Sequence, residues 1–254
     1  MVLNNKRVNF YDQKIPFQLD LLRNATNYQK WMIEVVSSFL GNNILEIGSG
    51  IGNMSRFLPV REKLIISEVN PDMIPFLKKT MDVFDNKKIN VLHIDLLTNW
   101  KQQLIDKNID TIVSFNVMEH VEDDLTFFKD LVDILRSNNS NNLKRIITFV
   151  PAHQFAYTAI DKNYGHFRRY SKKTLKNFQN IIIPEADFYC RYFNFIGLIG
   201  WIMSGFVFKK KEIDIKMVES FEKICPLIKP IDNFVHSKFK LQFGQSIFSV
   251  VSFK

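Results

Sequence analysis

The sequence has little cysteine, with two residues among 254, and it has only nine glycines and eight prolines. Cys190 and Cys225 lie far apart and form no C-x-x-C pair, so neither a disulfide framework nor a cysteine-based zinc site is expected. Residues 1–7 contain no apolar segment of the kind found in signal peptides. Together these features favour a cytoplasmic protein.

Long apolar runs are also scarce. The longest covers residues 195–208 and is followed by Lys209, Lys210 and Lys211. At about 14 residues it is shorter than the ~20 that a membrane span needs. We therefore expect no transmembrane span, and we expect this run to form a buried or lid helix. Weak contact with a membrane surface is the less favoured alternative.

The sequence lacks a dense basic tail, although its formal net charge is +8. The lysines are dispersed along the chain, which is typical of a solvated surface. No separate nucleic-acid-binding module is visible, so no nucleic-acid partner is expected. The charge alone keeps an RNA substrate possible and also permits an anionic small molecule.

What the sequence does contain is a regular alternation of apolar strand-like runs and helical patterns. Hydrophobic residues make up 46% of the chain, enough for a sizeable core. Such alternation predicts βαβ units and a parallel sheet within one α/β domain. The expected strands are 44–47, 64–68, 89–96, 109–116, 144–150, 181–183 continued at 186–193, and 245–253. The expected helices are 28–39, 54–58, one from 70, 124–136, 172–178, 195–208 and 212–239.

The chain is organised around residues 44–55, where a buried strand leads into Gly48, Gly50 and Gly52 and then into an expected helix. Glycines allow positive φ and let a ligand approach the main chain, and a helix start offers free N–H groups. A dinucleotide fingerprint would need its third glycine where Asn53 stands. Pyrophosphate binding is therefore disfavoured.

Polar residues follow the next strands at corresponding points. Glu68 ends the second expected strand about 20 residues after the first glycines, where an acid can bind ribose hydroxyls. Asp95 ends the third, although it fits a helix cap or turn equally well, and Asn116 ends the fourth. Since carboxyl ends of parallel strands meet at one crevice, the sequence predicts a site there for an adenosine-containing ligand.

The run E-I-G-S-G-I-G, residues 46–52, resembles the first motif of class I S-adenosylmethionine-dependent methyltransferases. Residues 116–124 resemble the fourth motif of their small-molecule branch, not the N-P-P-Y type. The resemblance implies a Rossmann-like, doubly wound, mostly parallel seven-stranded sheet with an antiparallel last strand and a helical insertion or lid before it. It also implies S-adenosylmethionine as cofactor, S-adenosylhomocysteine as product, and no metal.

The resemblance also implies roles for individual residues. The glycine turn passes under the methionine and ribose part, Glu46 helps place the ammonium group, Met73 lies against adenine, and Asp95 lies beside the adenine amino group. Tyr28 and Trp31 either cover the cofactor or pack on the sheet. The implied cofactor set is Trp31, Glu46, Gly48, Ser49, Gly50, Gly52, Glu68, Val69, Met73, Asp95, Leu96 and Asn116.

The run D-x-x-Y-G-H-x-R-R-Y-S, residues 161–171, resembles a bacterial subgroup often found in sugar and surface-glycan pathways. This implies methylation of an O or N atom in a sugar or phosphorylated small molecule, and it allows an anionic acceptor. His166 and His120 are the candidate bases, since imidazole titrates near neutrality. The substrate-binding candidates are Tyr164, His166, Arg168 and Arg169.

Alternatives stay open for this half. The loop could be a structural lid in which Arg168 or Arg169 pairs with Asp161, and His120 could be a structural histidine. Methylation of a lipid or quinone precursor is favoured only by the 195–208 run, and a non-catalytic adenosyl-ligand-binding module is a third possibility. We expect one domain, with an N-terminal helical cover (1–42), a cofactor-binding core (43–150), and an acceptor-side half (151–254) whose helical insertion spans about 195–240.

Overall fold

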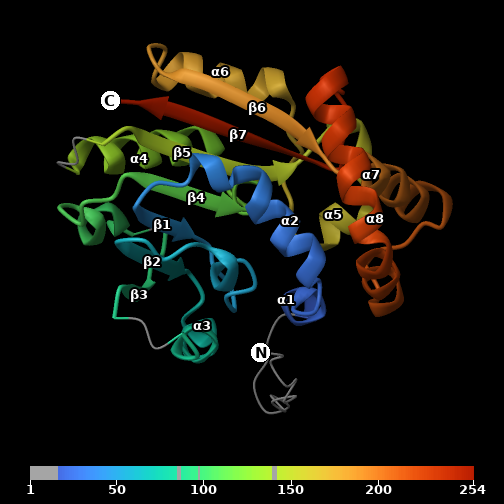
Figure 1. The fold of residues 1–254 in the computed structure, drawn as a ribbon, viewed down its shortest axis with the longest axis horizontal. Helices are drawn as coiled ribbons and strands as arrows, with labels where there is room; N and C mark the ends of the chain where they lie inside the picture. The colour runs from blue at the N-terminus through green and yellow to red at the C-terminus, as the bar shows by residue number, and fades with distance from the viewer. Residues whose placement is uncertain (1–16, 85–86, 97, 139–141) are drawn as a thin grey trace.

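The computed structural model describes residues 17–254 except 85–86, 97 and 139–141. Its centre is a seven-stranded sheet in the order β3-β2-β1-β4-β5-β7-β6 (Figure 1). The strands are β1 Asn43–Ile47, β2 Lys63–Glu68, β3 Ile89–His93, β4 Thr111–Phe115, β5 Lys144–Pro151, β6 Asp187–Phe193 and β7 Ser246–Phe253. Only β7 runs antiparallel to its neighbours, β5 and β6. The predicted fold class is confirmed.

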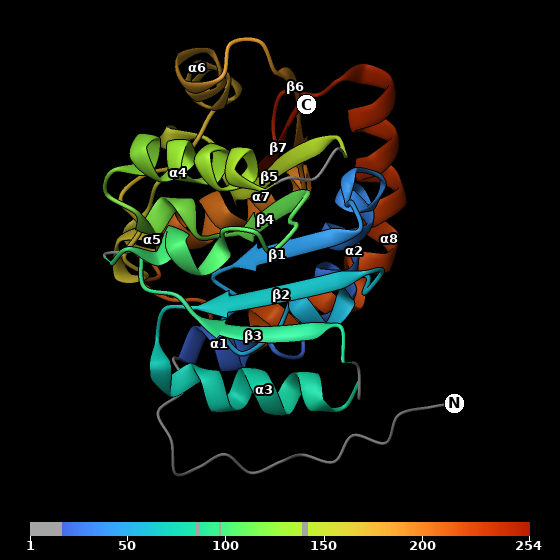
Figure 2. The same ribbon diagram turned by 90° about the vertical axis from the view of Figure 1, so that its left-hand side faces the viewer.

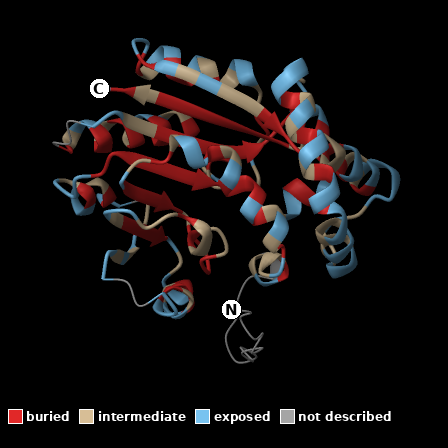
Figure 3. Cartoon of the chain, viewed as in Figure 1, coloured by how far each residue is buried: buried red, intermediate tan, exposed pale blue. Residues whose placement is uncertain are grey.

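The central strands are apolar because helices cover both faces of the sheet. Every residue of β1 and β4 is buried, including Glu46. A parallel strand covered on both faces has no solvent side, so it reads as a continuous apolar run and not as an alternation. Figure 3 shows the strands at the centre as buried and the outer sides of the helices as exposed.

The helices form a layer on each face of the sheet (Figure 2). One core cluster joins α4 (Asp124–Ser137) and α6 (Lys172–Ile182) to one face. The other joins α2 (Thr26–Val36), α3 (Ile74–Asp82) and α8 (Ile215–Phe239) to the opposite face. The shorter helices α1 (Phe17–Leu22), α5 (Ala159–Asn163) and α7 (Phe195–Ile202) lie near the end of the sheet where β1 and β4 terminate (Figure 1).

One sequence prediction is confirmed in part and another is wrong. The short helix expected at residues 54–58 forms as a 3-10 helix at Ser55–Phe57, and it ends there because Leu58 is extended before Pro59. Residues 181–183 belong to the end of α6 and are not strand. The Gln179 side chain donates to the carbonyl oxygens of Ile183 and Ala186, which holds the chain in its turn toward β6.

The segment before β7 is helical, as predicted. Residues 195–208 form α7 followed by a π-helical turn at Met203–Val207, and α8 follows. The buried carboxylate of Asp232 in α8 accepts hydrogen bonds from the backbone N–H groups of Asn194 and Phe195, at 3.2 and 2.8 Å, which fixes the start of α7. Among the described residues, no helix is both long enough and apolar enough to cross a membrane.

Candidate functional site

A cavity of about 470 Å³ lies at the carboxyl ends of β1 and β4. This volume is within the range of roughly 300–1,000 Å³ typical of small-molecule sites. Of the predicted site residues, those lining it are Glu46, Gly48, Ser49, Asn116, His120, Tyr164, His166 and Arg169. The predicted cofactor side and the predicted acceptor side therefore share one cavity.

The glycine turn forms one wall of this cavity. Gly48, Gly50 and Gly52 have φ values of 71°, 58° and 87°, in the left-handed region that side chains disfavour. A Cβ atom on Gly48 would also lie 2.5 Å from a methyl carbon of Val117. The turn therefore needs glycine for both its backbone conformation and its packing.

Glu46 lies at the base of the turn and is buried. Its carboxyl group accepts hydrogen bonds from the hydroxyl groups of Ser49, at 2.9 Å, and Ser55. Burial raises the pKa of Glu46 to about 7; the two hydroxyl groups oppose this rise, and nearby Glu68 adds to it. A cationic ligand group beside Glu46 would favour its charged form.

Glu68 supports the same turn from the neighbouring strand. Its carboxylate accepts hydrogen bonds from the backbone N–H groups of Gly50, at 2.8 Å, and Asn70, at 2.9 Å. Glu68 and Gly50 lie outside the cavity lining, as do Gly52, Val69, Asp95 and Leu96. In this structure Glu68 therefore holds the turn that forms the wall.

Trp31 and Met73 lie in the core. The Trp31 ring is fully buried 4.2 Å from the Phe193 ring centroid, so it packs on the sheet, which is one of the two alternatives the sequence allowed. Met73 packs with Ile51 and Phe76 beneath the glycine turn. From α2, Tyr28 is the aromatic residue that reaches the cavity.

Asp161 is the centre of the acceptor-side loop. Its fully buried carboxylate accepts hydrogen bonds from Nδ1 of His166 at 2.9 Å, Nε of Arg169 at 2.8 Å and the backbone N–H of Thr158 at 2.8 Å. Burial acts to raise the pKa of Asp161, but the bonds from His166 and Arg169 outweigh it and the pKa is lowered. Asp161 is therefore ionised, and it fixes the His166 ring.

The two arginines have different environments. Arg169 is buried; it donates to Asp161 and to the Ala152 carbonyl oxygen, and its guanidinium lies 4.5 Å from the Trp201 ring centroid. Arg168 lies outside the cavity lining. It forms an ion pair with Asp124 at 2.7 Å at the start of α4. The ion pair of Arg169 with Asp161 is the pairing expected if the loop is a structural lid.

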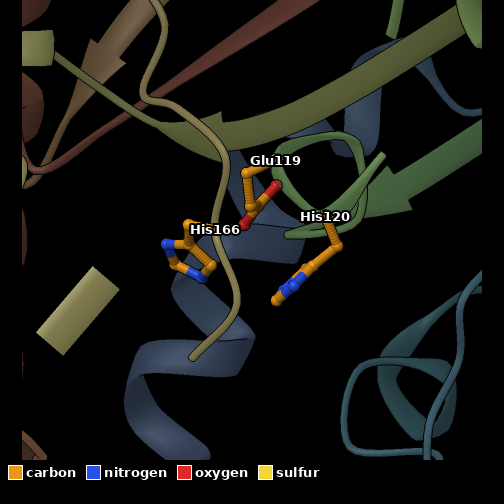
Figure 4. Close-up of side chains that lie close together, drawn as sticks. All are labelled: Glu119, His120 and His166. Atoms are coloured by element: carbon orange, nitrogen blue, oxygen red, sulfur yellow. The ribbon is translucent and has the colours of Figure 1, made fainter. Parts of the chain in front are cut away.

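Three side chains meet where β4 ends and the loop crosses it (Figure 4). The His120 and His166 rings lie edge to face with centroids 4.7 Å apart, beside Glu119. Burial, together with the neighbouring His166, lowers the pKa of His120 to about 4, against a smaller opposing effect of the Gly165 backbone. His120 is exposed, so solvent moderates this effect. Because its pKa is still lowered, His120 is neutral near pH 7.

Sequence reasoning assigned no role to Glu119. The residue is completely buried, and neither carboxyl oxygen has a hydrogen-bond partner among the described residues. Burial raises its pKa to about 8, against smaller lowering effects of its own backbone N–H and of Arg169. Its position directly before His120, after the fourth strand, was the signal that could have revealed it.

Comparison with known proteins supports a methyltransferase. Residues 44–138, which span β1 to α4, match the methyltransferase domain family. The ribosomal RNA small subunit methyltransferase A of Clostridioides difficile is 34% identical over 68 residues. That match spans 25% of this chain and 24% of the relative, so the chain spans only about a quarter of the curated relatives it matches.

The whole described fold has counterparts among solved structures. An S-adenosylmethionine-dependent methyltransferase from Archaeoglobus fulgidus superimposes with a TM-score of 0.58 and 17% identity, over 94% of this chain and all of that one. The methyltransferase domain of bacterial CtHen1 gives 0.54 and 13%, over 90% and 100%. At such identities the likeness shows the fold alone.

The domain match supports a methyltransferase enzyme, and the fold is the one found in S-adenosylmethionine-dependent methyltransferase structures. The resemblance seen in the sequence is thus confirmed at the level of the class. The sugar and surface-glycan subgroup stays a prediction.

Proposed function

We propose that the protein transfers a methyl group from S-adenosylmethionine to an O or N atom of a small acceptor, a sugar or phosphorylated metabolite used in bacterial surface-glycan synthesis in the cytoplasm. One observation carries this proposal: a single cavity joins the glycine turn and Glu46 to the two histidines. The acceptor class rests on the resemblance of residues 161–171 to the glycan-linked subgroup.

The cavity has features that fit S-adenosylmethionine. The turn at Gly48 and Ser49 presents main chain to the cavity with no Cβ at Gly48, and the buried Glu46 carboxyl lies beside it. We propose that Glu46 holds the ammonium group and that Asn116 lies near the reactive end. When bound, the cofactor supplies an electrophilic methyl group on its sulfonium sulfur, and the product is S-adenosylhomocysteine.

The acceptor side has groups that can take up a proton. Since ionised Asp161 accepts from Nδ1 of His166, the Nε2 lone pair of that ring is free to accept a proton from an acceptor hydroxyl. His120, neutral near pH 7, offers a second lone pair beside it. Either histidine can therefore act as the base that the sequence predicted.

The walls around these histidines orient the acceptor and exclude water. Tyr164 lines the cavity, and its hydroxyl accepts a 2.9 Å hydrogen bond from the backbone N–H of Ile213, which ties the loop to the segment between α7 and α8. Trp201 and Arg169 complete this wall. We propose that Tyr164 and His166 contact the acceptor, that Arg169 positions Asp161, and that Arg168 stabilises the loop.

The test combines binding with turnover. Calorimetry should show binding of S-adenosylmethionine and of S-adenosylhomocysteine, and mass spectrometry should show a gain of one methyl on a member of a panel of sugar phosphates and nucleotide sugars. His166→Ala should cut turnover while leaving cofactor affinity nearly unchanged. Binding of NAD in place of both sulfur compounds would overturn the proposal.

The same panel separates the alternative acceptors. Quinone and lipid precursors belong in it because of the apolar residues in 195–208. An RNA fragment belongs in it because of the net charge of +8 and the match to ribosomal RNA methyltransferases. Methylation confined to either would replace the sugar proposal, and cofactor binding without methylation of any member would favour a non-catalytic module.

A further inference from the structure

Glu119 has an environment that the proposed proton transfer does not explain. It is a carboxyl group with no solvent exposure, and neither oxygen has a hydrogen-bond partner among the described residues. Leaving such a group without a partner costs free energy unless a ligand satisfies it. Both histidines of the cavity lie beside it, with one ligand atom of each of the three residues within 4.8 Å of the others (Figure 4).

We propose that Glu119, His120 and His166 bind a divalent transition-metal ion, whose open coordination positions face the cavity and receive an oxygen atom of the acceptor. The binding of the ion stands independently of methyl transfer. Its use in holding the acceptor rests on the proposed function.

The spacing needs only a small adjustment. Ligand atoms about 2.1 Å from one ion lie at most about 4.2 Å apart, so the widest separation, up to 4.8 Å, must shorten by about 0.6 Å. His120 lies on a short 3-10 turn, Met118–His120, and is exposed, and His166 lies on a loop. Small rotations of these two side chains can supply the movement.

A positioning group for one ligand is already present. Metal-binding histidines usually donate their second ring N–H to a carboxylate, which fixes the ring and its tautomer. Asp161 accepts from Nδ1 of His166 at 2.9 Å, which leaves Nε2 as the nitrogen for the ion. Arg169 holds Asp161 from the other side at 2.8 Å. Asp161 and Arg169 are therefore positioning residues for this site.

The ligand set indicates the kind of ion. Two imidazole nitrogens and one carboxylate oxygen suit zinc, manganese, iron, cobalt or nickel better than magnesium, which prefers oxygen ligands. Three protein ligands leave at least one position open. An ion there polarises a coordinated hydroxyl and lowers its pKa. With the ion bound, the lone pairs of the two histidines are occupied, so the ion takes the place of a histidine base in activating the acceptor. From the sequence no metal is expected, because Glu119–His120 and His166 come from distant segments that meet only in the fold.

The experiment uses the full chain, freed of metal with EDTA and titrated with Co²⁺. We expect one cobalt per chain by elemental analysis, visible absorption from the bound ion, and saturation in calorimetry. His120→Ala and Glu119→Gln should each weaken binding at least about tenfold. His93→Ala is the matched control and should bind as the wild type does, because His93 lies on β3 with Nε2 bonded to the Val69 carbonyl oxygen.

Thermal unfolding checks that each variant is folded. If Glu119→Gln does not fold, His120→Ala decides the test, because it changes an exposed residue. The proposal is wrong if the wild type binds no cobalt at millimolar concentrations, or if His120→Ala binds cobalt as tightly as the wild type. The cobalt readout needs no methyl acceptor, so cobalt binding without any methylation would contradict the proposed function and leave the metal site standing.

Discussion

Single glycines decide whether the wall of the cavity can form. Gly50 has a φ of 58°, and a Cβ there would lie 3.2 Å from the Leu19 side chain of α1. Gly50→Val adds a branched side chain in a disfavoured conformation, so we expect it to abolish binding of S-adenosylmethionine in calorimetry. Gly200→Val is the control, since no atom of the described residues lies within 4 Å of a Cβ at Gly200. Equal binding by both variants would place the cofactor elsewhere.

A buried carboxyl group makes stability depend on pH. Burial holds the pKa of Glu46 at about 7, against 4.5 ordinarily, so between these values the folded protein keeps a proton that the unfolded chain has lost. The free energy of unfolding therefore falls as pH rises from about 4.5 to about 7, by at most about 3 kcal/mol.

Glu46→Gln should remove this dependence, because an amide does not titrate, while its oxygen can still accept from Ser49 and Ser55. Urea unfolding at pH 5 and pH 8 measures the effect. The variant should show a smaller loss of stability between the two pH values than the wild type. An identical loss in both proteins would mean that Glu46 titrates normally in the folded state.

Among the elements, α7 and the turn after it have two different sides. Leu198 and Trp201 are buried, and Trp201 lines the cavity, whereas Ile199, Phe206 and Phe208 are exposed. We expect Trp201→Ala to raise the acceptor KM several-fold and to leave cofactor affinity nearly unchanged, because only the acceptor side of the wall is altered. Phe206→Ser changes the outer side and should have neither effect.

The exposed apolar side of α7 and the turn after it allows a test of membrane contact. If α7 serves as a wall of the cavity and not as an anchor, the detergent-free protein should stay in solution with anionic liposomes at physiological salt. Pelleting with the liposomes, lost in Phe206→Ser, would show that the apolar outer side enters the membrane interface.

For the whole molecule, local patterns in the sequence were enough to predict most elements. Continuous apolar runs and their polar ends placed β1, β2 and β4 within a few residues. The short run at residues 181–183 failed, because three apolar residues fit the end of a helix as well as a strand. The short helix expected at 54–58 is a 3-10 helix limited to Ser55–Phe57, because Pro59 keeps Leu58 extended. The antiparallel direction of the last strand came from family resemblance and not from any local pattern, and the structure places that strand, β7, between β5 and β6.

The candidate site was predictable where it depends on strand ends. Parallel strands bring their carboxyl ends together, so the glycine turn, Glu68, Asp95 and Asn116 were expected to converge. Gly48 and Asn116 line one cavity, whereas Glu68 and Asp95 lie outside its lining. The ion pair between Arg169 and Asp161 was one of the alternatives that the sequence allowed. The hydrogen bond from His166 to Asp161 was not predictable, because it forms only when the loop folds over the end of β4. The burial of the Glu119 carboxyl group, without a hydrogen-bond partner among the described residues, could not be predicted either, since burial depends on residues distant in sequence.

The position of β7 in the sheet determines when the cavity is completed during synthesis of the protein. Residues of β5 from Lys144 to Pro151 pair with β7, and among the described strands β6 pairs only with β7. Until residues 246–253 have left the ribosome, the nascent chain has an open edge at β5, and β6 has no partner in the sheet. Gln245 and Ser246 also line the cavity. The wall of the cavity is therefore complete only once β7 has paired between β5 and β6.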